Sequence, residues 1–358
     1  MKPDTFIILT PGFPENEADS TCVPPQQIFV KALKEQYPQL NLVVLTLQYP
    51  FFSDAYEWHG IKVISFGSRY HGRIFKAPVN FRVQLTLKRL HQKYNIIGLL
   101  SFWFGKCAYI ANNFAKRNGL VHYSWILGQD AKAGNKYFKK IRTNSETLIA
   151  LSDFIVREFG KNCGVTPKHI IPVGIDTALF DDEAVERDID ILGAGSLIPL
   201  KQYDVFLEMI NSLVFFFPKI SAVICGGGPE LAALRASAKK MDIENNITFL
   251  GIQPHDKVLR LMQRSKIFLH PSSYEGFGAV CLEALYAGAH VVSFVKPMNT
   301  TTRNWHTVTC KEDMFCMLKK KLQSRNLSHE AVLPYPIEAN VKAMMALFNN
   351  SSRFLSKI

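Results

Sequence analysis

Two glutamates in one short stretch of the chain have the residue type and spacing of a binding site. Glu275 and Glu283 stand eight residues apart between His270 and Val292. We expect this stretch to begin at the end of an apolar strand, to turn through a Pro-Ser-Ser sequence and to enter a helix near Gly278. The glycine-rich segment 276–278 leaves the backbone uncovered where the first N–H groups of this helix lack partners.

Such a helix start attracts anions, because unpaired N–H groups and the positive end of the helix dipole coincide there. A phosphate group on these amides would leave Glu283 to accept hydrogen bonds from the two hydroxyls of a ribose. Glu275 would then hold a further hydroxylated group. This combination suits a nucleotide diphosphate sugar. The alternative is an ordinary capped helix with one glutamate on either side of a glycine turn.

The segments before this stretch predict the strands and loops that position the two glutamates. An apolar strand at Ile189–Gly193 leads into the loop Gly195–Lys201, whose lysine would offset the charge of a diphosphate. A second strand runs into the glycine triplet Gly226–Gly228, and a third, Ile247–Leu250, is followed by Ile252. A glycine triplet by itself more often marks a tight turn than a site.

The first half of the chain alternates short apolar runs with helical or polar segments, which is typical of a parallel sheet with crossover helices. We expect strands at Phe6–Leu9, Leu42–Leu47, Val63–Phe66, Ile96–Ser101, His122–Leu127 and Thr147–Leu151. We expect helices at Pro25–Gln36, Phe81–Tyr94, Lys106–Asn118, Ala133–Arg142 and Asp153–Phe159. Gly12 follows the first strand directly, at the carboxyl edge where ligands of open α/β sheets usually bind. The predicted fold class is α/β with two Rossmann-like domains.

The glutamate pair after His-Pro-Ser, together with the segment Pro172-Val-Gly-Ile-Asp176, resembles the signature of the retaining glycosyltransferases of family 4 (glycosyl transferases group 1). The resemblance implies the GT-B fold, in which two Rossmann-like domains face a cleft and the last helix crosses back to the first domain. It places an N-terminal acceptor-binding domain at 1–174, a nucleotide-sugar-binding domain at 175–335 and the returning helix at 336–358.

The resemblance also assigns roles to individual residues. It implies a donor site made of Gly12, Gly195, Ser196, Lys201, Gly226, Gly227, Ile252, Glu275, Gly276, Phe277, Gly278 and Glu283. Lys201, Glu275 and Asp130 are the residues that it implies for catalysis, and the alternative role of Asp130 is to cap the turn after its strand. Ser196 stands where relatives often have an arginine, and Arg303 is a candidate to replace it.

The implied reaction is a front-face transfer with retention, because no residue stands out as the carboxylate nucleophile that a double displacement needs. The leaving diphosphate, stabilised by the lysine and the helix amides, would accept the proton of the acceptor as the new bond forms. No cofactor and no obligatory metal are expected. Asp188-Ile-Asp190 has the spacing of a metal-binding motif, but its isoleucine and the next fit a buried strand. The predicted protein is an enzyme that moves a sugar from a nucleotide diphosphate to a glycan or lipid-linked acceptor in cell-surface polysaccharide synthesis.

Two other functions stay open on the sequence. A nucleotide-sugar epimerase of the same fold would process the donor without an acceptor. A catalytically degenerate nucleotide-sugar-binding subunit would bind the nucleotide without transferring the sugar. Ser196 motivates the second alternative, as does Leu127, which stands where relatives often have a histidine.

The positive charge of the chain is concentrated in its first half. Residues 1–174 hold 22 Lys and Arg against 11 Asp and Glu, a net charge of +11 out of +12 for the whole chain. Seven basic residues and no acidic one lie within Arg69–Lys93, interleaved with apolar residues, and five more lie within Lys132–Arg142. A basic face with apolar anchors predicts attachment to an anionic membrane surface through Arg69–Lys93. The alternative is a solvated basic face. Nucleic acid is not an expected partner, because the chain has no signature of a nucleic-acid-binding fold.

The sequence predicts a cytoplasmic protein with peripheral attachment to the inner face of the membrane. No apolar run approaches the ~20 residues that a membrane span needs. The N-terminus lacks the apolar region and cleavage site of a signal peptide. The seven cysteines are scattered without a Cys-x-x-Cys motif, which suits reduced thiols.

Overall fold

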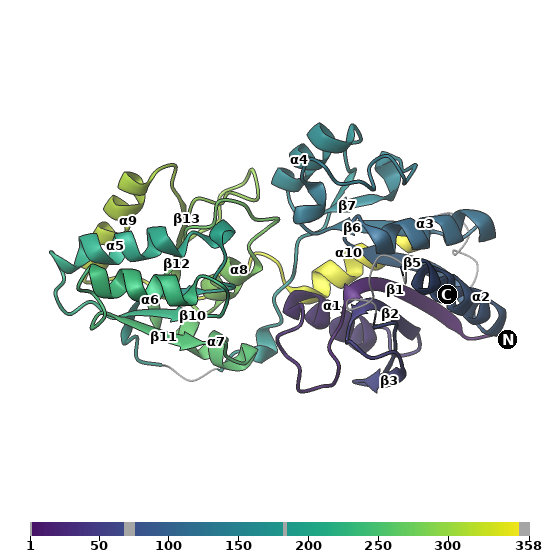
Figure 1. Ribbon diagram of the computed structural model, residues 1–358, viewed down its shortest axis with the longest axis horizontal. Helices are drawn as coiled ribbons and strands as arrows, with labels where there is room; N and C mark the ends of the chain where they lie inside the picture. The colour runs from purple at the N-terminus through teal and green to yellow at the C-terminus, as the bar shows by residue number, and fades with distance from the viewer. Residues whose placement is uncertain (1, 68–75, 182–184, 351–358) are drawn as a thin grey trace. The chain divides into compact units, whose positions relative to one another are not determined.

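The computed structural model describes residues 2–67, 76–181 and 185–350 (Figure 1). The chain forms two compact units, one of residues 1–174 together with 337–358, the other of residues 175–336. Each unit has its own parallel sheet and its own apolar core. Among the described residues, no helix has both the length and the apolar character needed to cross a membrane.

The first unit is built on an eight-stranded sheet with the order β3-β4-β2-β1-β5-β6-β7-β8. Its strands are β1 (Asp4–Gly12), β2 (Asn41–Tyr49), β3 (Ala55–Trp58), β4 (Ile61–Ser65), β5 (Asn95–Phe102), β6 (His122–Ile126), β7 (Leu148–Ala150) and β8 (His169–Ile170). Neighbouring strands run parallel except β3 and β4. The central strands are buried along nearly their whole length, as expected for a parallel sheet covered by helices.

The helices of the first unit include one from the far end of the chain. They are α1 (Pro24–Gln36), α2 (Lys76–Lys93), α3 (Lys106–Asn118), α4 (Asp153–Cys163) and α10 (Ile337–Asn350). Figure 1 shows α10, in yellow, lying beside α1. The ring of Phe348 packs edge-on against Phe6 at 4.7 Å and against Tyr123 at 4.9 Å. Gly98 leaves the space for this ring, because a Cβ there would lie 2.4 Å from it. The packing therefore fixes α10 in the core of the first unit.

The second unit is built on a six-stranded, all-parallel sheet with the order β11-β10-β9-β12-β13-β14. Its strands are β9 (Ile189–Ala194), β10 (Ala222–Cys225), β11 (Ile247–Gly251), β12 (Ser265–His270), β13 (His290–Ser293) and β14 (Trp305–Thr307). Its helices are α5 (Tyr203–Val214), α6 (Leu231–Lys240), α7 (His255–Gln263), α8 (Ala279–Tyr286) and α9 (Lys311–Gln323). Because β9 lies between β10 and β12, the loops after these strands meet at one edge of the sheet.

The predicted helix at Ala133–Arg142 is wrong, since these residues form successive turns. Gly134 has a φ of +84°, in the left-handed region that breaks a helix. The side chain of Asn135 donates hydrogen bonds to the carbonyl oxygens of Phe104 and Asp130, both at 2.8 Å. These contacts tie the segment to the neighbouring loop. The predicted strands of the first half are present with shifted ends, and β3 is an additional strand.

The helix predicted at Phe81–Tyr94 is present as α2. Most of its apolar side chains pack into the protein core, so they are not available to insert into a membrane. Val83, Leu87 and Leu90 are buried in the core of the first unit. Among the side chains of α2 whose burial is described, Phe81 is the one large apolar residue that is exposed, at 68%. The first part of the basic stretch, residues 69–75, lies outside the described residues. The core packing corrects the expectation that these apolar residues serve as lipid anchors.

Candidate functional site

The loops at the carboxyl edge of the second sheet lie against one another through their backbones. The N–H of Leu197, after β9, donates to the carbonyl of Gly227, after β10, at 2.9 Å. The N–H of Gly226 donates to the carbonyl of Gly251, the last residue of β11, at 2.8 Å. These bonds hold three of the predicted donor-binding loops in one layer.

The glycine triplet is what permits this close approach. A Cβ on Gly226 would lie 1.8 Å from the carbonyl oxygen of Gly195, and one on Gly228 would lie 2.3 Å from that of Leu197. The φ angles of these two glycines, +148° and +158°, also lie in the region that favours glycine. Next to them, Ser196 is exposed and Ile252 is 72% exposed, so both side chains are open to a ligand.

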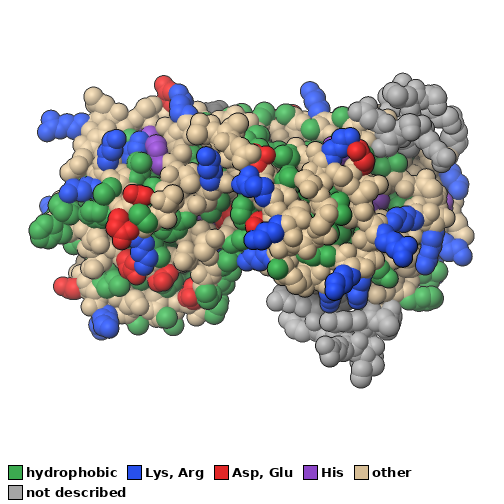
Figure 2. Space-filling model, turned by 90° about the horizontal axis from the view of Figure 1, so that it is seen from above, with side chains coloured by type: hydrophobic (Ala, Val, Ile, Leu, Met, Phe, Trp, Pro, Cys, Tyr) green, Lys and Arg blue, Asp and Glu red, His purple; other side chains and the backbone are tan. Residues whose placement is uncertain are grey.

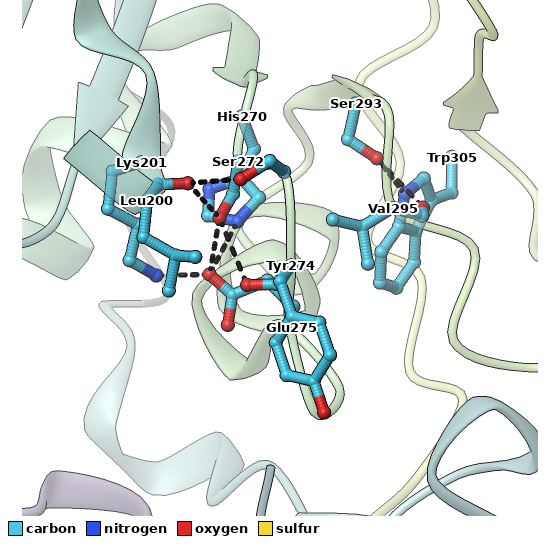
Figure 3. A network of polar contacts seen from close by, with 10 residues as sticks. Leu200, Lys201, His270, Ser272, Tyr274, Glu275, Ser293, Val295 and Trp305 are labelled. Carbon is cyan, nitrogen blue, oxygen red and sulfur yellow. Dashed lines mark hydrogen bonds and ion pairs between the residues drawn. The ribbon is translucent and has the colours of Figure 1, made fainter. Parts of the chain in front are cut away.

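Glu275 lies in the loop after β12, where one of its two carboxylate oxygens is held by three side chains (Figure 3). His270 Nε2 lies 3.1 Å from Oε1, and the hydroxyl of Ser272 donates to the same oxygen at 3.0 Å. Lys201 forms an ion pair with it from the loop after β9. The second oxygen, Oε2, accepts no hydrogen bond from any described residue. It is therefore available to a hydroxyl of a ligand.

The electrostatics of this cluster keep Glu275 ionised. Burial acts to raise its pKa, but the hydrogen bond from His270 and the charge of Lys201 outweigh burial and lower the pKa to about 2. Burial lowers the pKa of His270, and although Glu275 opposes this effect the pKa stays below its ordinary value. Because an ionised carboxylate can only accept, His270 Nε2 is the donor in this hydrogen bond. The geometry of His270 makes it a support for Glu275.

Glu283 lies in the second turn of α8 and has a partner that sequence reasoning missed. His255 Nε2, at the start of α7, lies 2.9 Å from Glu283 Oε1, and the two side chains are 16% and 11% exposed. Burial acts to lower the pKa of His255, but the hydrogen bond and charge of Glu283 raise it overall. No local pattern marks this pair, because the residues are 28 positions apart on different helices.

The start of α8 has no side-chain cap, but residues 276–278 are buried, which corrects the expectation that their backbone lies uncovered. Gly278 precedes the helix with a φ of +85°, and no side chain caps the first turn. Phe277 is 2% exposed and packs against Tyr335, with the ring centroids 5.6 Å apart. Its side chain therefore anchors the loop that leads into α8.

Comparison with known families identifies the part of the chain that holds this cluster. Residues 175–303 match the family model described as glycosyl transferases group 1. The second unit is a glycosyl transferases group 1 domain. The glycine-lined loops, Lys201, Glu275 and Glu283 all lie within the matched residues.

Curated relatives of this group 1 domain match part of the chain. The chain is 36% identical over 164 residues to the phosphatidylinositol N-acetylglucosaminyltransferase gpi3 subunit of Schizosaccharomyces pombe, covering 44% of this chain and 36% of that protein. It is 30% identical over 135 residues to a phosphatidylinositol N-acetylglucosaminyltransferase protein of Arabidopsis thaliana, covering 36% of this chain and 30% of that protein. The matches thus span about a third of the length of these two relatives.

Solved structures match this chain along nearly its whole length. A glycosyltransferase of Rickettsia africae covers 99% of this chain and 100% of its own, with a TM-score of 0.73 and 12% identity. The Anabaena protein Alr3699/HepE, solved with UDP and glucose, covers 99% and 100%, with a TM-score of 0.67 and 14% identity. At this identity the likeness shows the fold, which is the two-domain GT-B fold predicted from the sequence.

Arg303, the candidate to replace the missing arginine, lies in the loop after β13. That guanidinium pairs with Glu330 at 2.9 Å, and both side chains are more than half exposed. A cavity of about 220 Å³ beside Phe277 is lined by residues that include Lys296 and the threonines 300–302. Lys296 is thus a further candidate for the second cation near the group 1 site.

The two remaining predicted site residues, Gly12 and Asp130, belong to the first unit. Gly12 ends β1. The carboxylate of Asp130 is buried and accepts hydrogen bonds from the backbone N–H groups of Phe104 at 2.6 Å, Gly128 at 2.8 Å and Leu127 at 3.1 Å. Burial raises its pKa to about 6, while these backbone bonds act to lower it. The geometry favours the alternative role of Asp130, which is to hold its own loop together.

The candidate metal motif has structural partners. Asp188 pairs with Arg264, and Asp190 pairs with Lys266 at 2.7 Å and accepts the N–H of Ser221 at 2.9 Å. Within the described part of the chain, no group of three or more His, Cys, Asp or Glu side chains is arranged to hold a metal ion.

Proposed function

We propose that this protein is a retaining glycosyltransferase that moves a sugar from a nucleotide diphosphate to a hydroxyl of a glycan or lipid-linked acceptor. The observation that carries the proposal is the Glu275 carboxylate, which stays ionised, has one oxygen held by protein donors and presents the other to a ligand. It stands among glycine-lined loops at the ligand-binding edge of a group 1 domain.

In the proposed donor complex, each part of the nucleotide sugar meets a group of matching chemistry. Glu283, oriented by His255, accepts hydrogen bonds from the ribose hydroxyls. The uncapped start of α8 and the ammonium of Lys201 bind the diphosphate. One Lys201 hydrogen is directed to Glu275, and an ammonium has two further donors for phosphate oxygens. Glu275 Oε2 accepts a hydroxyl of the donor sugar.

The proposed reaction proceeds at one face of the sugar. The acceptor oxygen forms a bond to the anomeric carbon while the bond from that carbon to the diphosphate oxygen breaks. The leaving diphosphate accepts the acceptor proton, and Lys201 with the α8 amides stabilises its developing charge. Glu275 is too acidic to act as a general acid at neutral pH, since its pKa is about 2. It acts by positioning the sugar, and no protein carboxylate needs to bond to the anomeric carbon.

We place the reaction in the synthesis of a cell-surface glycan or glycolipid at the inner face of the membrane. Two features support this placement. The curated relatives include a Mycobacterium tuberculosis protein named as a GDP-mannose-dependent phosphatidylinositol monomannoside mannosyltransferase, which is 23% identical over 273 residues. The exposed basic residues of α2, among them Lys88 and Arg89, remain available to an anionic surface.

A nucleotide-binding experiment tests the donor site. Calorimetric titration of the full chain with UDP, GDP, ADP and their sugar conjugates, with and without a chelator, identifies the base. Glu283→Gln is expected to weaken binding of the preferred nucleotide by roughly tenfold, since a charged hydrogen bond contributes about 1.5–3 kcal/mol. Glu244→Gln, at an exposed glutamate of the same unit, is the matched control and should bind as the wild type does. Equal affinity of all three proteins, or no binding of any nucleotide, would contradict the proposed site.

A further inference from the structure

A second cavity lies wholly within the first unit, at the carboxyl edge of its sheet. Its volume is about 510 Å³, and its walls include the carboxyl ends of β1, β2 and β5 and the loop that leads from β5 into α3. The residues that matter for its chemistry are Gln48, Trp103, Lys106, Lys136 and Tyr137. This edge is where open α/β sheets bind their ligands, and the volume suits a small head group.

The cavity is basic. Lys106 enters it from the first turn of α3, and Lys136 from the turn segment 132–142, which holds five basic residues and no acidic one. No acidic side chain is among the described residues that line the walls. Among the charged side chains on the face in Figure 2, blue ones outnumber red ones over the unit at the right, while the other unit carries both colours. The cavity therefore combines a local pair of cations with the positive field of its unit.

The two basic walls are held together by a clamp of hydrogen bonds. Asp130 Oδ2 accepts the N–H of Phe104, and the side chain of Asn135 donates to the carbonyl of the same residue at 2.8 Å. Asn135 Oδ1 in turn accepts the N–H of Tyr137 at 3.0 Å. The clamp fixes residues 103–106 and the turn that carries Lys136 in one arrangement, before any ligand binds.

The aromatic wall is held in an uncommon conformation. Trp103 has a φ of +63°, a left-handed value that a bulky residue adopts only at a cost of ~1–3 kcal/mol. The N–H of Gly105 donates to the carbonyl of Trp103 at 2.8 Å, which closes a tight turn before α3. Strain of this kind concentrates at ligand sites, where the surrounding structure maintains it.

We propose that this cavity binds the phosphate of an anionic acceptor, a phosphomonoester or phosphodiester carried by a polyol or sugar head group. Lys106 and Lys136 bind the phosphate, and Trp103 and Tyr137 pack against the ring. Asp130 is a positioning residue, because it acts through the backbone of the wall. This inference rests on the proposed glycosyltransferase function and names its acceptor class.

Binding of a soluble head group to the full chain tests the assignment. Glycerophosphoinositol is titrated calorimetrically into the wild type and into Lys106→Gln, Lys136→Gln and Lys139→Gln, with unphosphorylated inositol as the reference ligand. Lys139 is the matched control, since it is exposed on the same basic turn and does not line the cavity. We expect roughly tenfold or greater loss for each of the first two variants and less than twofold for the third. Equal losses for Lys136→Gln and Lys139→Gln would show a diffuse basic surface and overturn the proposal, as would no loss in any variant.

Vesicles distinguish the source of the phosphate. Phosphatidylcholine vesicles containing phosphatidylinositol are compared with vesicles containing the same fraction of phosphatidylserine. Tighter Lys136-dependent binding to phosphatidylinositol vesicles than to the soluble head group supports a lipid acceptor. Equal affinity per head group supports a soluble phosphorylated acceptor. Binding to neither overturns the proposal.

Nucleotide affinity separates the failure of this inference from that of the proposed function. Lys106→Gln and Lys136→Gln should leave the affinity for the preferred nucleotide unchanged, since they lie in the other unit. Glu283→Gln should weaken nucleotide binding and leave the affinity for glycerophosphoinositol unchanged. Loss of nucleotide binding in a cavity variant would contradict the assignment of separate sites.

Discussion

Replacing Glu275 by glutamine tests whether the charge of this residue organises the group 1 site. The substitution preserves size and one hydrogen-bond acceptor but leaves the ammonium of Lys201 beside a neutral amide. The pKa of Glu275 falls from 4.5 to about 2, which corresponds to about 3 kcal/mol of preference for the charged form in the folded state. We therefore expect Glu275→Gln to destabilise the protein by about 1–3 kcal/mol at pH 7, with the lower end reflecting the remaining hydrogen bonds.

The lowered pKa of Glu275 determines how the destabilisation caused by Glu275→Gln should change with pH. A carboxyl group whose pKa is depressed on folding contributes stability above its unfolded value of 4.5 and loses that contribution as the pH falls toward 2. The difference in stability between wild type and Glu275→Gln should thus be constant above about pH 5.5 and shrink below about pH 4.5. Scanning calorimetry of both full chains between about pH 3.5 and 7.5 measures it. Glu244→Gln is the control and should follow the wild type.

Activity should fall further than stability explains. The donor sugar would lose a charged acceptor for one hydroxyl, so we expect kcat/KM to fall by roughly ten- to a hundredfold at a temperature where the variant is folded. A difference in stability that does not change down to about pH 3.5 would refute the electrostatic argument. Unchanged kcat/KM in a folded Glu275→Gln protein would refute the assigned contact with the sugar.

Three further predictions follow from contacts in the second unit. His255→Ala leaves Glu283 without its side-chain partner and should raise the nucleotide Kd about fivefold in calorimetry, equivalent to ~1 kcal/mol; an unchanged Kd would contradict the positioning role. Gly226→Ala places a Cβ against a backbone carbonyl and should cost at least ~2 kcal/mol in thermal unfolding, so a loss below ~0.5 kcal/mol would show that the loops can separate. Burial lowers the pKa of both His290 and His306 to about 4, so stability should be full above pH 6.5 and fall as the pH drops toward 4. His290→Gln should flatten that pH profile, and an unchanged slope would contradict the assignment.

The sequence by itself determined the parts of this protein that depend on neighbouring residues. Apolar runs predicted the strands, because a strand buried on both faces must be apolar along its length. The spacing of Glu275 and Glu283 placed both beside one turn and one helix start, since only a few residues separate them. Gly226 and Gly228 were recognisable as a turn, although the reason for glycine there is the backbone of another loop. Ala133–Arg142 was mispredicted as a helix for the same reason, because Asn135 bonds to a loop that is distant in sequence.

Only the tertiary structure decided which side chains meet. Lys201 and Glu275 are 74 positions apart, and they form an ion pair because β9 and β12 are neighbours in the sheet. The sequence indicated a lysine for phosphate but not the carboxylate that holds it. In the sequence, Asp130 is a polar residue at the end of a predicted strand. In the folded protein, its carboxylate accepts hydrogen bonds from three backbone N–H groups. Strand order is set by the packing of the whole sheet, and so these long-range contacts leave no local pattern in the chain.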